Sequence, residues 1–244
     1  MHYLILGSIV IFTASFIQGI TGFGFALIAV PLLSYFLPLK SIVPLVVLYS
    51  LATNLFILKE TRNHIRLKDI RWVIIFGIIG IPFGVWILKT VDVNLLKTLA
   101  GFTIAITAAA MIKGFQMKFR NEVISSGVAG FLSGVLNGSI SMSGPPVVIF
   151  LANKDAEKDV FRANLSLYGI ITNLITIASF FISGLASPVI FKNFIFLFPG
   201  LVAGIMIGNL TVRKINETLF RKLILISIIA MGLTIVITSL SKLI

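Results

Sequence analysis

Long apolar segments recur along the whole chain, and they decide what it can fold into. The 244 residues are 58% hydrophobic and 11% charged, and many apolar runs approach the ~20 residues that a helix needs to cross about 30 Å of hydrocarbon. Ten segments can be drawn, at about 3–18, 23–37, 41–58, 70–88, 95–112, 123–137, 145–153, 160–183, 193–212 and 219–241. The sequence therefore predicts an all-α polytopic membrane protein with about 8–10 membrane segments.

Some of these segments are too short to cross a bilayer alone. Residues 145–153 would span only about 14 Å as a helix, at ~1.5 Å per residue. The first segment has no basic stretch before it and no small-residue cleavage site, so we expect it to be retained and not removed as a signal peptide.

Basic residues are concentrated in alternate loops. If the loop at 59–71 is cytoplasmic, alternation puts 113–122, 154–162 and 213–222 on the same side, and these four loops hold 15 of the 20 Lys and Arg. We therefore expect a multi-pass protein of the cytoplasmic membrane with both termini outside the cytoplasm. The placement of these residues in short loops explains the net charge of +12 without a nucleic-acid partner.

The two halves of the chain resemble each other. LYSLATNL at 48–55 matches LYGIITNL at 167–174 at an offset of 119, and Gln18-Gly19 matches Asn137-Gly138 at the same offset. Gly80 and Gly84 match Gly200 and Gly204 at an offset of 120. Several matches in order indicate an internal duplication, 1–121 and 122–244, within a single membrane domain. Each repeat holds five segments, an odd number, so the second must be inverted relative to the first.

Each repeat begins with a helix that is interrupted by poor helix formers. The first break is QGITGFG at 18–24, and the second is NGSISMSGPP at 137–146. Irregular backbone at membrane depth is tolerated where protein or a water-filled cavity surrounds it. We therefore expect two broken or re-entrant helical hairpins that enter from opposite faces and meet near the midplane.

These motifs resemble the sulfite exporter TauE/SafE family. The residues that carry the resemblance are QGITGFGFALIAVP at 18–31 and GVLNGSISMSGPPVVIF at 134–150, and it extends over essentially the whole chain. The resemblance implies a membrane transporter for anions such as sulfite and organosulfonates, with carboxylates in some relatives. Export is implied by the family name alone.

The chemistry of the breaks also favours an anion. The short helices after the breaks would direct their N-termini, with unpaired N–H groups and partial positive charge, toward the centre of the protein. Thr21 and Ser143 are the expected caps. All eight acidic residues lie in loops or at segment ends, whereas a cation carrier normally has a carboxylate within the membrane. The candidate substrate-binding residues are Gln18, Gly19, Thr21, Gly22, Gly24, Asn54, Asn137, Gly138, Ser139, Ser141, Ser143, Gly144, Arg162 and Asn173.

Some of these assignments have structural alternatives, and for Gln18 and Asn137 the alternative to a role in the site is a helix–helix hydrogen bond. Asn54 and Asn173, which both repeats keep, would form either helix–helix hydrogen bonds or a pair of site donors. Arg162, which aligns with Val43, would either anchor its helix at the cytoplasmic surface or admit anions from that side.

The leading hypothesis is a secondary transporter that moves a small anion by alternating access. An anion channel of the same fold is the first alternative, and a membrane-embedded enzyme is the second. With no Cys and only two His, we expect no catalytic residues, metal site or cofactor. The expected partners are a small anionic substrate and membrane lipids, and a homodimer is left open.

Overall fold

The computed structural model describes residues 2–35, 37–96, 98–99, 101–103, 122–154, 156–185, 188–220 and 222–223. These residues are almost entirely helical, with no strand among them. The helices are α1 (His2–Thr21), α2 (Phe25–Leu33), α3 (Leu39–Thr61), α4 (Leu67–Thr90), α6 (Glu122–Ile140), α7 (Gly144–Ala152), α8 (Lys158–Ile182) and α9 (Pro188–Val212), and a short 3₁₀ turn, η1 (Arg62–His64), links α3 to α4. The predicted segments at 95–112 and 219–241 lie largely outside the described residues.

Five described helices are long and apolar enough to span a bilayer: α3 with η1, α4, α6, α8 and residues 194–212 of α9. Large hydrophobic side chains remain exposed on these helices, among them Phe83, Trp86 and Phe196. Outward-facing apolar side chains of this size are expected of a surface in contact with lipid. The prediction of an all-helical, multi-pass membrane protein is confirmed.

Both predicted breaks are present, and each separates a long helix from a helix of nine residues. The first break lies between α1 and α2, where Gly22 and Gly24 have φ of 84° and 99°. The second lies between α6 and α7, where Ser141 has φ of 62° and two prolines occupy the first turn of α7. A nine-residue helix is about 14 Å long, so neither α2 nor α7 can span the hydrocarbon core alone.

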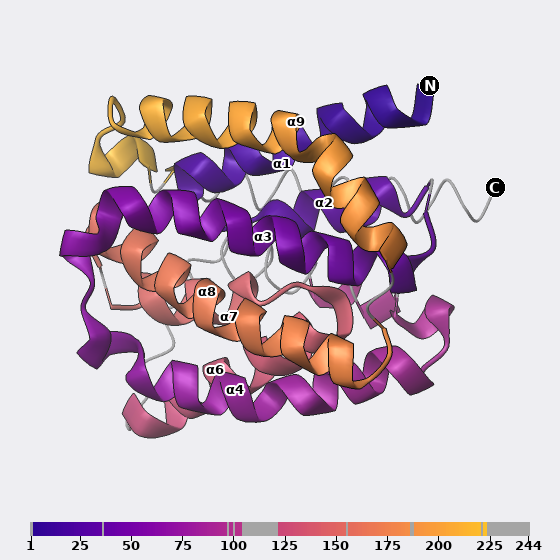
Figure 1. The fold of residues 1–244 in the computed structure, drawn as a ribbon. Helices are drawn as coiled ribbons and strands as arrows, with labels where there is room; N and C mark the ends of the chain where they lie inside the picture. The colour runs from indigo at the N-terminus through magenta and orange to yellow at the C-terminus, as the bar shows by residue number, and fades with distance from the viewer. Residues whose placement is uncertain are drawn as a thin grey trace.

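The helix bounds recur at the offset found in the sequence. The first and last residues of α2 become those of α7 when 119 is added, and the first residue of α3 becomes that of α8. In Figure 1, α1 and α9 lie at the top, α4 and α6 at the bottom, and α3 and α8 between them. The fourth helix of each half thus packs against the first helix of the other half, and the two third helices pack against each other.

Glycines allow these crossed helices to approach closely. A Cβ added to Gly84 on α4 would lie 2.9 Å from Gly138 Cα on α6, and one added to Gly208 on α9 would lie 3.0 Å from Gly19 Cα on α1. By these contacts, Gly208 has in the second half the place that Gly84 has in the first. The sequence comparison paired Gly84 with Gly204, which lies four residues earlier. Because the glycines of α9 recur every four residues, a shift of about one turn presents the same small-residue face.

The basic loops lie together at one end of the molecule. The ion pairs that connect them are Arg66–Glu157, Lys154–Asp69, Lys154–Glu122 and Arg213–Glu60. These contacts bring together described residues from all four loops that alternation assigned to one side.

Candidate functional site

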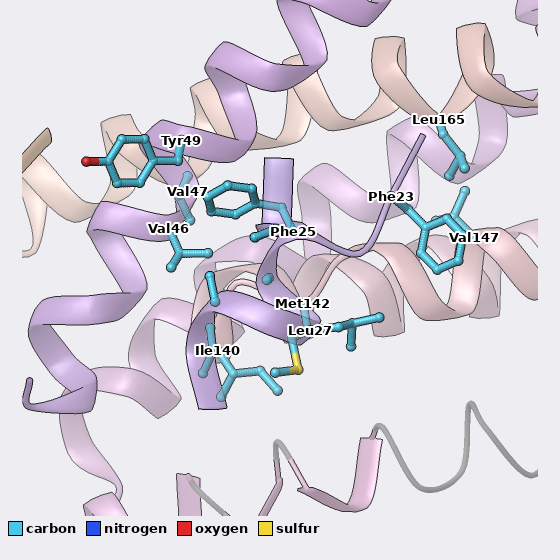
Figure 2. Close-up of a cluster of buried hydrophobic side chains, with 14 of the residues drawn as sticks. Phe23, Phe25, Leu27, Val46, Val47, Tyr49, Ile140, Met142, Val147 and Leu165 are labelled. Atoms are coloured by element: carbon cyan, nitrogen blue, oxygen red, sulfur yellow. The ribbon is translucent and has the colours of Figure 1, made fainter. Parts of the chain in front are cut away.

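A cavity lies where the two breaks meet. It has about 40 Å³ of free space, room for about three water molecules, and is lined by residues of both breaks and of the middle of α3 and α8. The lining residues are Gln18, Gly22, Phe23, Gly24, Phe25, Ala26, Leu27, Ser50, Asn54, Ser141, Met142, Ser143, Gly144, Pro145, Leu165, Tyr168, Gly169 and Asn173. Figure 2 shows Phe23 of the first break and Met142 of the second in one buried cluster with Leu165.

Most of the lining residues form pairs that are related by the offset of 119. The pairs are Gly22 and Ser141, Phe23 and Met142, Gly24 and Ser143, Phe25 and Gly144, Ala26 and Pro145, Ser50 and Gly169, and Asn54 and Asn173. The two halves therefore contribute matching positions to a single cavity, and the short helices α2 and α7 both begin at its wall.

Matching amide pairs connect each first helix to its third helix. Gln18 Nε2 on α1 donates to Asn54 Oδ1 on α3 at 2.9 Å, and Asn137 Nδ2 on α6 donates to Asn173 Oδ1 on α8 at 3.1 Å. Asn137 Nδ2 also donates to Thr176 Oγ1 at 3.0 Å, and Asn137 does not line the cavity. The structural and functional alternatives for Asn54 and Asn173 are thus compatible, since both side chains bridge helices and also face the cavity.

The first break rests against a buried arginine. Gly22 packs on Arg162 of α8, since a Cβ added to Gly22 would lie 3.2 Å from Arg162 Cγ. Arg162, 2% exposed, donates through Nη2 of its guanidinium to Gly19 O at 2.7 Å and to Asn209 Oδ1 of α9 at 2.9 Å. Its closest carboxylate oxygen among the described residues is Asp159 Oδ1, at 3.9 Å. Arg162 therefore holds a carbonyl of the broken helix, and the Gly22 backbone separates it from the cavity.

The second break is closed by hydroxyl and backbone bonds. Ser141 Oγ donates to Val43 O of α3 at 2.7 Å, and Met142 N donates to Leu136 O at 3.2 Å. Ser133 Oγ donates to Ser143 O, and Tyr168 OH donates to Ser133 Oγ at 2.7 Å. The Ser141 hydroxyl thus bonds this break to α3, and its backbone is bonded to α6, with no charged partner in these bonds.

Comparison with known proteins adds the family to this geometry. A family model described as sulfite exporter TauE/SafE matches residues 7–235. The chain belongs to the sulfite exporter TauE/SafE family. Neither a search of curated proteins nor a search of solved structures finds a significant match. Membership in the TauE/SafE family, together with the apolar helices, makes the chain a multi-pass membrane transporter.

Two details of the TauE/SafE chain correct the sequence analysis. Neither short helix has a side-chain cap: the residue before α2 is Gly24, and Ser143 before α7 makes no capping bond. Thr21 Oγ1 instead donates to Ile17 O and Phe23 O, at 2.8 and 2.7 Å. The same oxygen accepts from Phe23 N at 3.3 Å, within the break, and the residue at the N-cap position of α2 is Gly24, so the hydroxyl closes the break and does not cap the helix.

Not all of the candidate residues in this TauE/SafE protein reach the cavity. Those that line it are Gln18, Gly22, Gly24, Asn54, Ser141, Ser143, Gly144 and Asn173. Those that lie outside the lining are Gly19, Thr21, Asn137, Gly138, Ser139 and Arg162. The second set supports the first: Gly19 and Gly138 pack against α9 and α4, and Ser139 Oγ donates to Val135 O within its own helix.

Several lining residues were not predicted from the sequence. Ser50 and Gly169 lie on α3 and α8 within the repeated motif that supplied Asn54 and Asn173, so the motif itself was the available signal. Gly169 is required for packing, because a Cβ there would clash with Asn54 Nδ2. The apolar part of the lining, including Phe23 and Leu165, could not be distinguished from ordinary core residues by composition.

Proposed function

We propose that this TauE/SafE protein moves a small oxyanion across the cytoplasmic membrane by alternating access, with the substrate bound between the two breaks. The observation that carries the proposal is the cavity itself, whose lining is built from matching positions of the two halves. A site shared by two repeats is accessible from either side when the repeats rock against each other.

The proposed architecture is a pair of inverted repeats, 1–121 and 122–244. The recurrence of helix bounds at an offset of 119 and the crossed packing of α4 with α6 and of α1 with α9 support this arrangement. In it, α1 with α2 and α6 with α7 are re-entrant hairpins from opposite faces. The end that carries the ion-paired basic loops is cytoplasmic, and both termini lie outside.

Backbone and side-chain dipoles are the proposed ligands for the anion. The first N–H groups of α2 belong to Phe25, Ala26 and Leu27, and all three residues line the cavity. The amide groups of Asn54 and Asn173 and the hydroxyl of Ser50 add polar side chains. Free N–H groups at a helix start favour an oxyanion, so sulfite, an organosulfonate or a related carboxylate is the proposed substrate. Export is the direction implied by the family.

Flux assays in proteoliposomes test the proposal. Uptake of sulfite, of a small sulfonate and of a small carboxylate is measured for the wild-type protein and for Asn54→Asp, which adds a negative charge to the cavity with little change in shape. We expect the wild-type protein to transport at least one of these anions and the variant to lose at least about tenfold in uptake, the effect of ~1.4 kcal/mol.

The matched control is Asn63→Asp, the same substitution at an exposed residue of η1, which should transport normally. All proteins are checked for a monodisperse state in detergent. Normal uptake in a folded Asn54→Asp protein would show that the cavity is not the substrate site, and an equal loss in the control would show that the effect of the added charge is not specific to the cavity. Saturable uptake with counterflow is expected of a carrier, whereas single-channel currents would indicate the anion channel.

A further inference from the structure

We propose that the cavity accepts singly charged oxyanions and rejects dianions, so that sulfite is bound as hydrogensulfite, its protonated monoanion. This inference rests on the proposed function and specifies the charge of the substrate. It starts from the lining: among the described residues around the cavity there is no Lys, Arg, His, Asp or Glu. The anion would therefore be held by dipoles, with no ion pair in direct contact.

One buried cation lies behind the cavity wall. Arg162 is separated from the cavity by the backbone of Gly22 and is bonded through Nη2 to two neutral acceptors, Gly19 O and Asn209 Oδ1. Asp159 Oδ1, at 3.9 Å from the guanidinium, already offsets part of its charge, so Arg162 can balance at most about one negative charge in the cavity. The desolvation cost of an ion grows with the square of its charge, so a dianion loses about four times as much hydration as a monoanion, and the second charge has no partner.

The N–H donors are also fewer than two helix starts would supply. The residues at the start of α2 keep their N–H groups, but Pro145 and Pro146 remove two from the first turn of α7. The positive end of α2 is equivalent to roughly half a charge. This donor set suits one negative charge better than two.

An unpaired acceptor indicates that the substrate carries a hydrogen. Gln18 lines the cavity and is 3% exposed, its Nε2 donates to Asn54 Oδ1, and its Oε1 has no hydrogen-bond partner. A carbonyl oxygen repels a fully ionised oxyanion but accepts a hydrogen bond from a protonated one. A hydrogen-bearing monoanion therefore satisfies Gln18 where a dianion would not.

If sulfite binds as hydrogensulfite, its binding must depend on pH. Few titratable side chains among the described residues lie close enough to the cavity to add a pH dependence of their own. Tyr168 is the one titratable side chain among the described lining residues, and its hydroxyl donates to Ser133 Oγ. Behind the lining, α8 carries Arg162 with Asp159 beside it, and the nearby Glu60 of α3 is ion-paired to Arg213. The described parts of α1, α2, α6 and α7 that face the cavity carry no charged side chain.

The test is a competition experiment with the full-length wild-type protein in proteoliposomes. Methanesulfonate is a monoanion and sulfate a dianion over the whole range from weakly acidic to weakly basic pH, whereas hydrogensulfite and sulfite exchange one proton near neutrality. Methanesulfonate has the proposed charge but lacks the hydrogen that would satisfy Gln18, so it tests the charge alone. We expect it to compete with labelled sulfite, and sulfate to be at least about tenfold weaker than methanesulfonate, a difference of ~1.4 kcal/mol. The apparent affinity for sulfite should fall about tenfold per pH unit once hydrogensulfite becomes the minor form, while that for methanesulfonate stays constant.

Competition by sulfate equal to that by methanesulfonate, or sulfite binding that strengthens as pH rises, would overturn the inference and leave the proposed transport function intact. Absence of flux for every anion would overturn the proposed function itself. A variant adds an independent measurement. Ser143→Lys places a cation in the lining and should strengthen competition by sulfate at least tenfold, whereas Ser143→Met, which adds similar bulk without charge, should not. Equal sulfate competition in these two variants would also contradict the inference.

Discussion

The two breaks share one left-handed residue but differ two residues later, where Gly24 has φ of 99° and Ser143 has φ of −69°, and they are stabilised differently. In both, the third residue after the matched glycine has a left-handed conformation, with φ of 84° at Gly22 and 62° at Ser141. Gly22 adopts this conformation without steric cost and packs against Arg162. Ser141 is a non-glycine residue in a conformation that costs roughly 1–2 kcal/mol, and its hydroxyl donates to Val43 O.

The difference between the breaks extends to the helices behind them. Arg162 and Val43 are related by the offset of 119, and the contacts that match Gly84 with Gly208 also match Val85 with Asn209. The first break thus has a polar pair, Arg162 and Asn209, where the second has two valines. At these matched positions the first break therefore lies against a buried charge, whereas the second lies against apolar side chains.

The largest expected effect comes from removing the polar pair. Arg162→Val leaves Gly19 O and the Asn209 side chain without their buried donor, and we expect the free energy of unfolding to fall by about 3 kcal/mol. Asn209→Val removes one acceptor of the guanidinium and should cost about 2 kcal/mol. The measurement is reversible unfolding in mixed micelles.

The double variant is the informative control, because it gives the first break the valine pair of the second. Arg162→Val with Asn209→Val should be less destabilised than the sum of the single variants by about 1 kcal/mol, since neither polar group is then left alone. Strict additivity would mean that Arg162 and Asn209 do not act as a unit.

An intermediate effect on stability is expected at Gly22, the left-handed glycine that packs against Arg162. Gly22→Ala forces a Cβ into the left-handed conformation and toward Arg162, so the free energy of unfolding should fall by about 2 kcal/mol. Gly184 also has a positive φ, of 73°, but no atom of the described residues lies within 4 Å of a Cβ added there. Gly184→Ala therefore isolates the conformational part, and we expect it to cost about 1 kcal/mol. Equal losses at the two positions would show that packing against Arg162 contributes nothing.

Much of this architecture could be predicted from the sequence because it follows from local chemistry. The lengths of the apolar runs predict the long helices, and the clusters of Gly and Pro predict the two breaks. The repeated motif led to Asn54 and Asn173 in the cavity lining. Each of these signals lies within a few residues of the feature that it predicts.

The remaining features depend on residues that are distant in sequence. The bonds of Arg162 to Gly19 and Asn209 join residues 143 and 47 positions apart, and no local pattern indicates them. Thr21 has a residue type that caps helices, but its hydroxyl bonds to Ile17 of α1 and to the backbone of Phe23, before α2 begins. The pairing of Gly84 with Gly208 could not be read from the sequence, because glycines repeated every four residues allow more than one register.

The smallest expected change in stability is at Ser141, and it bears most directly on the comparison of the two breaks. Ser141→Gly gives the second break the glycine of the first, relieving about 1–2 kcal/mol of backbone strain while losing about 1 kcal/mol from the bond to Val43 O and about 0.5–1 kcal/mol of chain entropy. These terms nearly cancel, so the free energy of unfolding should change by less than about 0.5 kcal/mol. Ser141→Ala keeps the strain and loses the bond, so it should cost about 1 kcal/mol. If instead Ser141→Gly were more destabilised than Ser141→Ala by the full ~0.5–1 kcal/mol of chain entropy, the left-handed conformation there would carry no measurable strain.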